Sequence, residues 1–141
     1  MKKITLELQE KKVTLNEINS FEKEYGFKLI NSYKSFLTEN NGGVPIENIF
    51  WDGNIASGVS VFFPLKYGKN SLENTISYLH REDALPKTYF PFASTGGASI
   101  YAFSMKKENF GEVYIFNFDG SEPFKITNSF EEFIESLEID E

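Results

Sequence analysis

The chain has 141 residues, of which 40% are hydrophobic and 16% aromatic, and it contains 15 phenylalanines and no cysteine. This length fits one domain with a phenylalanine-rich core. The lack of cysteine excludes disulfides, thiolate catalysis and cysteine-held metals, and it suits a reducing cytoplasm. A formal net charge of -7 disfavours binding to nucleic acid and favours a basic partner, although the same acidity also keeps a cytosolic protein in solution.

The N-terminal segment alternates apolar and polar residues over 4–12. This period of two predicts a half-exposed strand with Ile4, Leu6 and Leu8 on one face. The alternation also leaves no continuous apolar region after the initial lysines, so we expect no signal peptide. No apolar run approaches the ~20 residues of a membrane helix, so we expect no membrane partner.

Two helices are expected next. Thr14 and Glu17 form a capping-box pattern for a helix over residues 14–24, which Gly26 ends. The second helix lies within residues 29–45, where Asn31 or Ser32 can cap its N-terminus. The buried face of this helix is formed by Tyr33, Phe36 and Leu37. The helix is stopped by the residues that follow it, Asn41, Gly42, Gly43 and Pro45.

The middle of the chain predicts short strands and one more helix. An apolar cluster over residues 49–51 precedes an Asp-Gly turn, and residues 58–63 are rich in Val and Phe, as strands are. Residues 70–81 predict a helix capped by Asn70 or Ser71. A loop is expected through Pro86 and Pro91.

The last third predicts two central strands over residues 99–105 and 112–118, a short strand over 124–126, and a helix over 129–137. Ser129 and Glu132 repeat the capping-box pattern of the first helix. The order of elements predicts an α+β fold in which about four helices pack on a mainly antiparallel sheet. We expect residues 1–141 to form a single domain.

Few residues are suited to catalysis. His80, the one histidine, falls near a helix end, where a solvated imidazole is ordinary, and no partner for acid–base chemistry is marked. A Ser-His-Asp triad depends on geometry and stays open at this point. The usual zinc ligand sets and the acidic spacing of a calcium loop are both missing. We therefore expect no metal and no cofactor, and the residues themselves mark no active site. Trp51 is expected in the core; if exposed, it would be an interface anchor.

Taken together, five segments resemble the SUKH superfamily of bacterial immunity proteins and fungal cell-wall-synthesis regulators. In this sequence the segments are Ile18–Gly26, Leu29–Pro45, Tyr89–Ile100, Gly111–Phe116 and Ser129–Leu137. Two positions depart from the family pattern: Leu29-Ile30 replaces a usual Leu-Pro, and Thr95 replaces a common acidic residue.

The resemblance implies a non-catalytic, cytoplasmic bacterial protein that binds and neutralises a cognate secreted toxin, often a nuclease. A scaffold or regulator of cell-wall assembly is the alternative, and a hydrolytic domain using His80 is a third. The chain is expected to be a monomer or a weak homodimer that binds neither nucleic acid nor membrane. The candidate binding residues are Asn41, Gly42, Gly43, Trp51, Asp52, Glu82, Asp83, Thr95, Gly96, Gly97 and Asp119. The glycine-containing turns among them are expected to be mainly structural.

Overall fold

The computed structural model describes residues 1–140, which form an α+β fold. Four α-helices confirm the expected number. They are α1 (Leu15–Tyr25), α2 (Asn31–Glu39), α3 (Leu72–Arg81) and α4 (Phe130–Glu135), and a short 3-10 turn, η1, spans Lys107–Asn109. None of the helices in this described part is long and apolar enough to cross a membrane.

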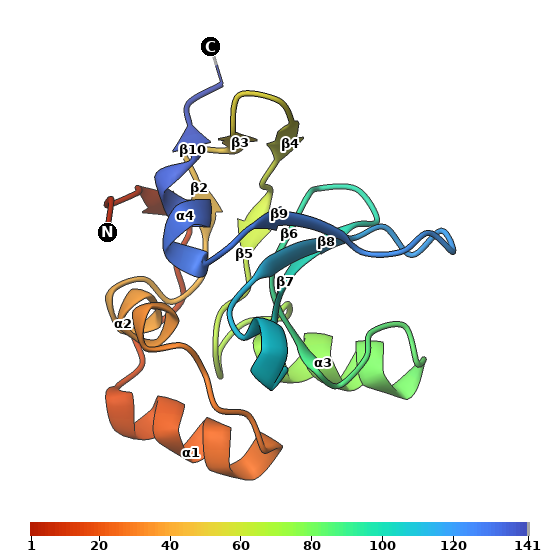
Figure 1. Cartoon of the computed structure of the whole chain (residues 1–141). Coiled ribbons are helices and arrows are strands. Elements are labelled where there is room, and N and C mark those ends of the chain that lie inside the picture. The colour runs from red at the N-terminus through yellow and green to blue at the C-terminus, as the bar shows by residue number, and fades with distance from the viewer. Residues whose placement is uncertain (141) are drawn as a thin grey trace.

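The strands form three antiparallel sheets (Figure 1). The largest has the order β5 (Val61–Phe62), β6 (Tyr89–Ser94), β7 (Ile100–Ser104), β8 (Val113–Phe116) and β9 (Phe124–Thr127). A three-stranded sheet has the order β10 (Leu137–Glu138), β3 (Ile49–Trp51) and β4 (Ala56–Gly58). A two-stranded pair joins β1 (Leu6–Glu7) to β2 (Val44–Pro45).

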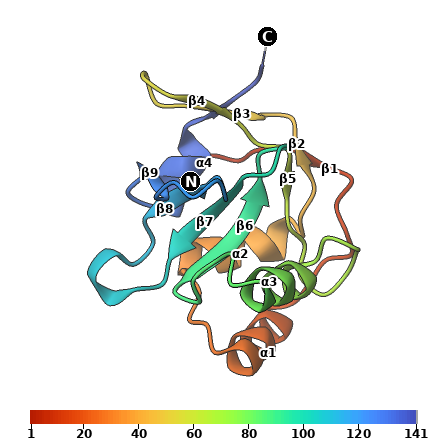
Figure 2. The same ribbon diagram turned by 90° about the vertical axis from the view of Figure 1, so that its right-hand side faces the viewer.

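An aromatic cluster forms the centre of the core. The ring of Tyr33 from α2 lies 5.6 Å from that of Phe90 and 5.3 Å from that of Phe130. The C-terminal segment places its whole apolar stripe in this core, because Phe130, Phe133 and Ile134 of α4 and Leu137 of β10 are fully buried. α3 packs beside β6, as Figure 2 shows. Burial of so many large rings is the main source of stability of such a domain.

The ends of the helices follow the sequence pattern in most places. Thr14 and Glu17 make the expected capping box, and Gly26 ends α1 in the left-handed conformation with φ 76°. The expected cap of α2 is wrong, since Ile30 occupies the N-cap position and no side chain caps it. The Ser32 hydroxyl instead donates to Glu131 of α4 at 2.7 Å, which ties the two helices together.

Several strands differ from expectation. The N-terminal strand covers only residues 6–7, and Leu8 is 82% exposed with φ 57°. Residues 58–63 are not one strand, because the chain changes partner near Ser60, whose N–H donates to Ser94 O of the large sheet. Residues 136–138 leave the helix of the C-terminal segment, and residues 137–138 pair with β3 as β10.

The largest error concerns residues 89–94, which lie in the expected loop and form β6, a buried central strand. Pro91 lies opposite Ala102, and the register of β6 against β7 shifts between Pro91 and Ala93. Such a bulge is one of the few places where a sheet tolerates proline, since proline has no N–H to donate.

Candidate functional site

Three of the candidate residues lie inside the molecule. Asn41 is fully buried; its side-chain amide donates to Lys11 O at 2.7 Å and to Leu65 O at 2.9 Å, and its Oδ1 accepts from Leu65 N at 2.7 Å. Gly42, with φ 73°, packs so closely on Pro64 that a Cβ would lie 2.7 Å from it. A Cβ on Gly43 would lie 2.5 Å from Glu7 O. These residues join separate segments and do not form an outer surface.

A second group of candidates borders a groove of about 560 Å³ between α3 and one end of the large sheet. Three of the residues that line this groove are sequence neighbours of candidates. Ala98 follows Gly97, Ala84 follows Asp83, and Phe118 precedes Asp119. The fold therefore brings together three segments that are far apart in the sequence. Two exposed aromatic side chains, Tyr78 and Phe118, belong to the groove and were not singled out from the sequence.

Local hydrogen bonds shape the turns at this groove. The Thr95 hydroxyl donates to Ser99 O at 3.2 Å and accepts from Gly97 N at 3.3 Å. The Ser99 hydroxyl donates to Asn117 Oδ1 at 2.6 Å, which connects the β6–β7 turn to the β8–β9 hairpin. In that hairpin the Asp119 carboxylate accepts from the Ser121 hydroxyl and N–H, and these bonds hold the pKa of Asp119 below its usual value.

The remaining candidates near α3 are the exposed pair after its last turn. Glu82 forms an ion pair with Arg81 at 3.5 Å, and Asp83 adopts a positive φ of 53°. Both side chains are solvent-exposed, so the ion pair contributes little to stability.

Trp51 and Asp52 lie elsewhere, on the β10–β3–β4 sheet and its β3–β4 turn. Trp51 is 43% exposed, so the expectation of a core tryptophan is wrong. Phe50 fills the core position instead, because neighbouring residues of a strand point to opposite faces. The Asp52 carboxylate accepts from Asn54 N and Ile55 N, both at 2.8 Å, and these bonds lower its pKa. Asp52 is thereby held ionised beside an exposed indole.

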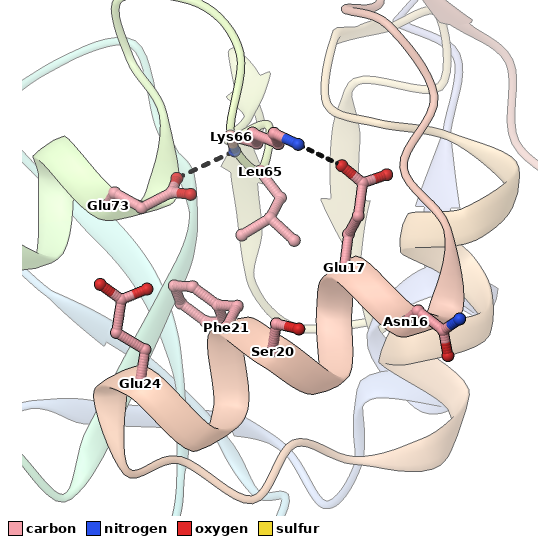
Figure 3. Close-up of a pocket in the computed structure, with 8 residues that line it drawn as sticks. All are labelled: Asn16, Glu17, Ser20, Phe21, Glu24, Leu65, Lys66 and Glu73. Carbon is pink, nitrogen blue, oxygen red and sulfur yellow. Dashed lines mark hydrogen bonds and ion pairs between the residues drawn. The ribbon is translucent and has the colours of Figure 1, made fainter.

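A further cleft of about 370 Å³ lies between α1 and the start of α3 (Figure 3). Lys66 crosses it, with its side chain 2.5 Å from Glu17 and its N–H donating to Glu73 at 2.9 Å. The first of these bonds is the main reason that the pKa of Glu17 is lowered. These charged groups connect α1 to the segment before α3. Within residues 1–140, no group of three His, Asp or Glu side chains could hold a metal ion.

His80 is not the solvated side chain that was expected. It is half-buried beside Phe27, with ring centroids 6.4 Å apart, and its Nε2 is covered without a hydrogen-bond partner in the described residues. Burial, and then the positive charge of Lys87, lower the pKa of His80. The surroundings favour a neutral imidazole and give it no partner for proton transfer.

Comparisons with known proteins place the chain in a family. No curated protein matches it. The model of one family does match, over residues 12–136, and this family is described as SMI1 / KNR4 (SUKH-1). The matched range contains all four helices and the eight strands from β2 to β9. The resemblance seen in the sequence is thus confirmed, and the chain belongs to the SMI1/KNR4 family (SUKH-1) of the SUKH superfamily.

Proposed function

We propose that this protein is an immunity protein that binds a cognate secreted toxin and neutralises it, without catalysing a reaction itself. Membership of the SUKH-1 family carries the proposal, because immunity proteins and regulators are the roles associated with this superfamily. The net charge of -7 supports a basic toxin, such as a nuclease whose nucleic-acid-binding face is positively charged. Binding to that face would exclude the substrate by charge and by shape.

The surface of the molecule is compatible with such a role. Large apolar side chains are exposed on several elements, among them Trp51, Tyr78 and Phe118. Tryptophan and tyrosine are the residue types that most often carry the binding energy at protein interfaces. The cytoplasm of the producing or receiving cell is the compartment in which this protection would operate.

Co-expression with the product of the adjacent gene tests the proposal. We expect that product to stop growth when it is expressed alone, and growth to recover when this chain is expressed with it. The two proteins should then co-purify as a stable complex. Recovery of growth without a complex would contradict neutralisation by binding. Absence of toxicity and of a complex would instead favour the regulator of cell-wall assembly, which retrieval of wall-synthesis enzymes would support.

A further inference from the structure

The β10–β3–β4 sheet has one face in the core and one in solvent. Phe50 and Leu137 pair in register and are fully buried, so they define the inner face. Partners in register share a face of a sheet, which places Trp51 with Ala56, and Glu138 with Ile49, on the outer face. No helix covers this side of the sheet in Figure 1 or Figure 2. The outer face thus presents the half-exposed Trp51 next to Ala56, with Ile49 and Glu138 on the same face.

The segments that build this sheet carry only negative charge. Residues 35–65 contain no lysine, arginine or histidine, and neither do residues 126–141. The fold brings these two segments together, so that Glu138 on the outer face, Asp52 in the β3–β4 turn and Asp140 after β10 are all exposed. None of these three forms an ion pair within the described residues.

One basic side chain approaches the sheet from its β10 edge. The Lys2 ammonium donates to Leu137 O at 2.5 Å, and the Lys2 N–H donates to Glu135 at 2.6 Å. The hydrogen bonds of Lys2 are therefore made to the edge of β10 and to α4. The carboxylates of Glu138 on the outer face and of Asp52 in the β3–β4 turn can therefore pair with basic groups of a partner.

We propose that the outer face of the β10–β3–β4 sheet is the surface on which this protein docks a basic face of its toxin, with Trp51 as the central anchor. This inference rests on the proposed function. Trp51 supplies apolar area that a partner can bury, while Asp52, Glu138 and Asp140 attract a positively charged surface and set its orientation. Apolar anchors surrounded by polar groups are the usual arrangement of a protein interface.

The negative charge of this face determines which kind of partner can bind to it. A second copy of the chain would place the same acidic groups opposite one another across a two-fold axis, and like charges repel. Nucleic acid would be repelled for the same reason. A basic protein surface can pair with the exposed carboxylates and bury the exposed indole.

The test uses the wild-type chain and four variants, with the adjacent gene product as the probe. Trp51→Ala removes the anchor. Asp52→Asn combined with Glu138→Gln removes two charges, while the amide introduced at position 52 keeps an oxygen that can accept the turn hydrogen bonds. Tyr78→Ala tests the separate groove as the competing binding site, because Tyr78 is an aromatic residue with 56% exposure that lines this groove. Ser77→Ala on α3 controls for substitution at an exposed surface position. Thermal unfolding confirms that each variant is folded.

We expect Trp51→Ala to weaken binding by about 30-fold or more, as for an interface hot spot. The double charge variant should slow association by about 10-fold at low salt, and this difference should shrink as salt is added. Ser77→Ala and Tyr78→Ala should both bind within about 3-fold of wild type, because neither residue lies on the outer face of the β10–β3–β4 sheet. Since Trp51 is the one tryptophan of the chain, fluorotryptophan labelling gives a single fluorine NMR signal, which should shift when the probe binds.

Two results would overturn the inference in different ways. In the first, the wild-type chain and Trp51→Ala bind the probe equally well, Tyr78→Ala does not bind it, and the fluorine signal does not shift. This result would place the interface at the groove and leave the proposed function intact. Failure of the wild-type chain to bind the probe or restore growth would remove the proposed function, and this inference with it.

Discussion

Two buried tyrosines differ in what their hydroxyl groups contact. The Tyr33 hydroxyl is buried without a hydrogen-bond partner in the described residues. The Tyr101 hydroxyl donates to Gly58 O at 2.6 Å and lies 2.5 Å from the Ser57 hydroxyl, which connects the large sheet to β4. Burial raises the pKa of Tyr33 and raises that of Tyr101 to about 12, so both hydroxyls stay protonated at neutral pH.

The same substitution should therefore have opposite effects at these two positions. Tyr33→Phe removes a polar group that was buried unpaired, and we expect the free energy of unfolding to rise by about 1 kcal/mol. Tyr101→Phe removes bonds between two sheets, and we expect a loss of about 1–2 kcal/mol. Urea denaturation measures both changes. A loss of stability in Tyr33→Phe would mean that its hydroxyl has a partner.

Asn41 gives a second prediction at the residue scale. Its side-chain amide forms hydrogen bonds with backbone groups of Lys11 and Leu65, and the bonds to Leu65 are buried. Asn41→Ala would leave these groups unpaired, so we expect a loss of about 3 kcal/mol in urea denaturation. The neighbouring Asn40 makes one exposed side-chain contact at 3.3 Å, and Asn40→Ala should cost less than about 1 kcal/mol. Equal effects of the two substitutions would contradict a structural role specific to Asn41.

At the scale of elements, the contact between His80 of α3 and Phe27, which follows α1, should make the stability of the fold depend on pH. His80 of α3 has a pKa lowered by burial and by Lys87, whereas in the unfolded chain its pKa is close to the ordinary 6.5. The folded state thus favours the neutral imidazole. Its stabilising contribution is complete above pH 6.5 and is lost as the pH falls through 6.5 towards the lower, folded pKa.

We expect the free energy of unfolding to decrease between pH 7 and pH 5, a range in which the carboxylates whose pKa values are lowered, such as Glu17 and Asp52, stay ionised. His80 is the one histidine of the chain, so His80→Leu should flatten the profile over this range. Chemical denaturation at each pH gives the comparison. An unchanged slope in His80→Leu would show that another group is responsible.

The elements also show where inference from sequence succeeds. Periodicity and caps located α1, α3 and α4, because their apolar stripes and their Thr14, Ser71 and Ser129 caps are local signals. β6 was missed, because Pro91 argues against a strand unless the bulge opposite β7 is known. The exposure of Trp51 was missed for a related reason, since three consecutive apolar residues do not reveal which of them faces the core.

The candidate surfaces were predictable only in part. Trp51 and Asp52 are neighbours in sequence, so they could be named as a pair. The acidic character of their sheet depends on the pairing of β3 with β10, which joins residues 50 and 137. The groove combines α3, β7 and the β8–β9 hairpin. Its aromatic member Tyr78 lies off the apolar stripe of α3, and Phe118 lies beyond the end of β8, although the sequence predicted a strand up to residue 118. Contacts of this range depend on the tertiary fold.

At the scale of the whole molecule, the C-terminal segment completes the core. Phe130 lies 5.4 Å from Phe92 and 5.4 Å from Phe36, and Phe133 lies 5.6 Å from Phe50, as ring centroids. Deletion of residues 129–141 would expose these rings and remove β10. We expect this variant to lack a cooperative thermal transition. Deletion of residues 139–141 keeps α4 and β10 and should retain the transition. Cooperative unfolding of the longer deletion would show that the core is stable without α4.

This placement of α4 has a consequence for the protein during its synthesis. The rings of α2 and β6 can pack fully only against residues 130–137, so a nascent chain that lacks them leaves aromatic surface uncovered. α4 must therefore emerge from the ribosome before these rings can be covered and the core completed. A growing chain rich in phenylalanine is then a substrate for chaperones or for aggregation, and the time between synthesis of β6 and of α4 sets the length of that exposure.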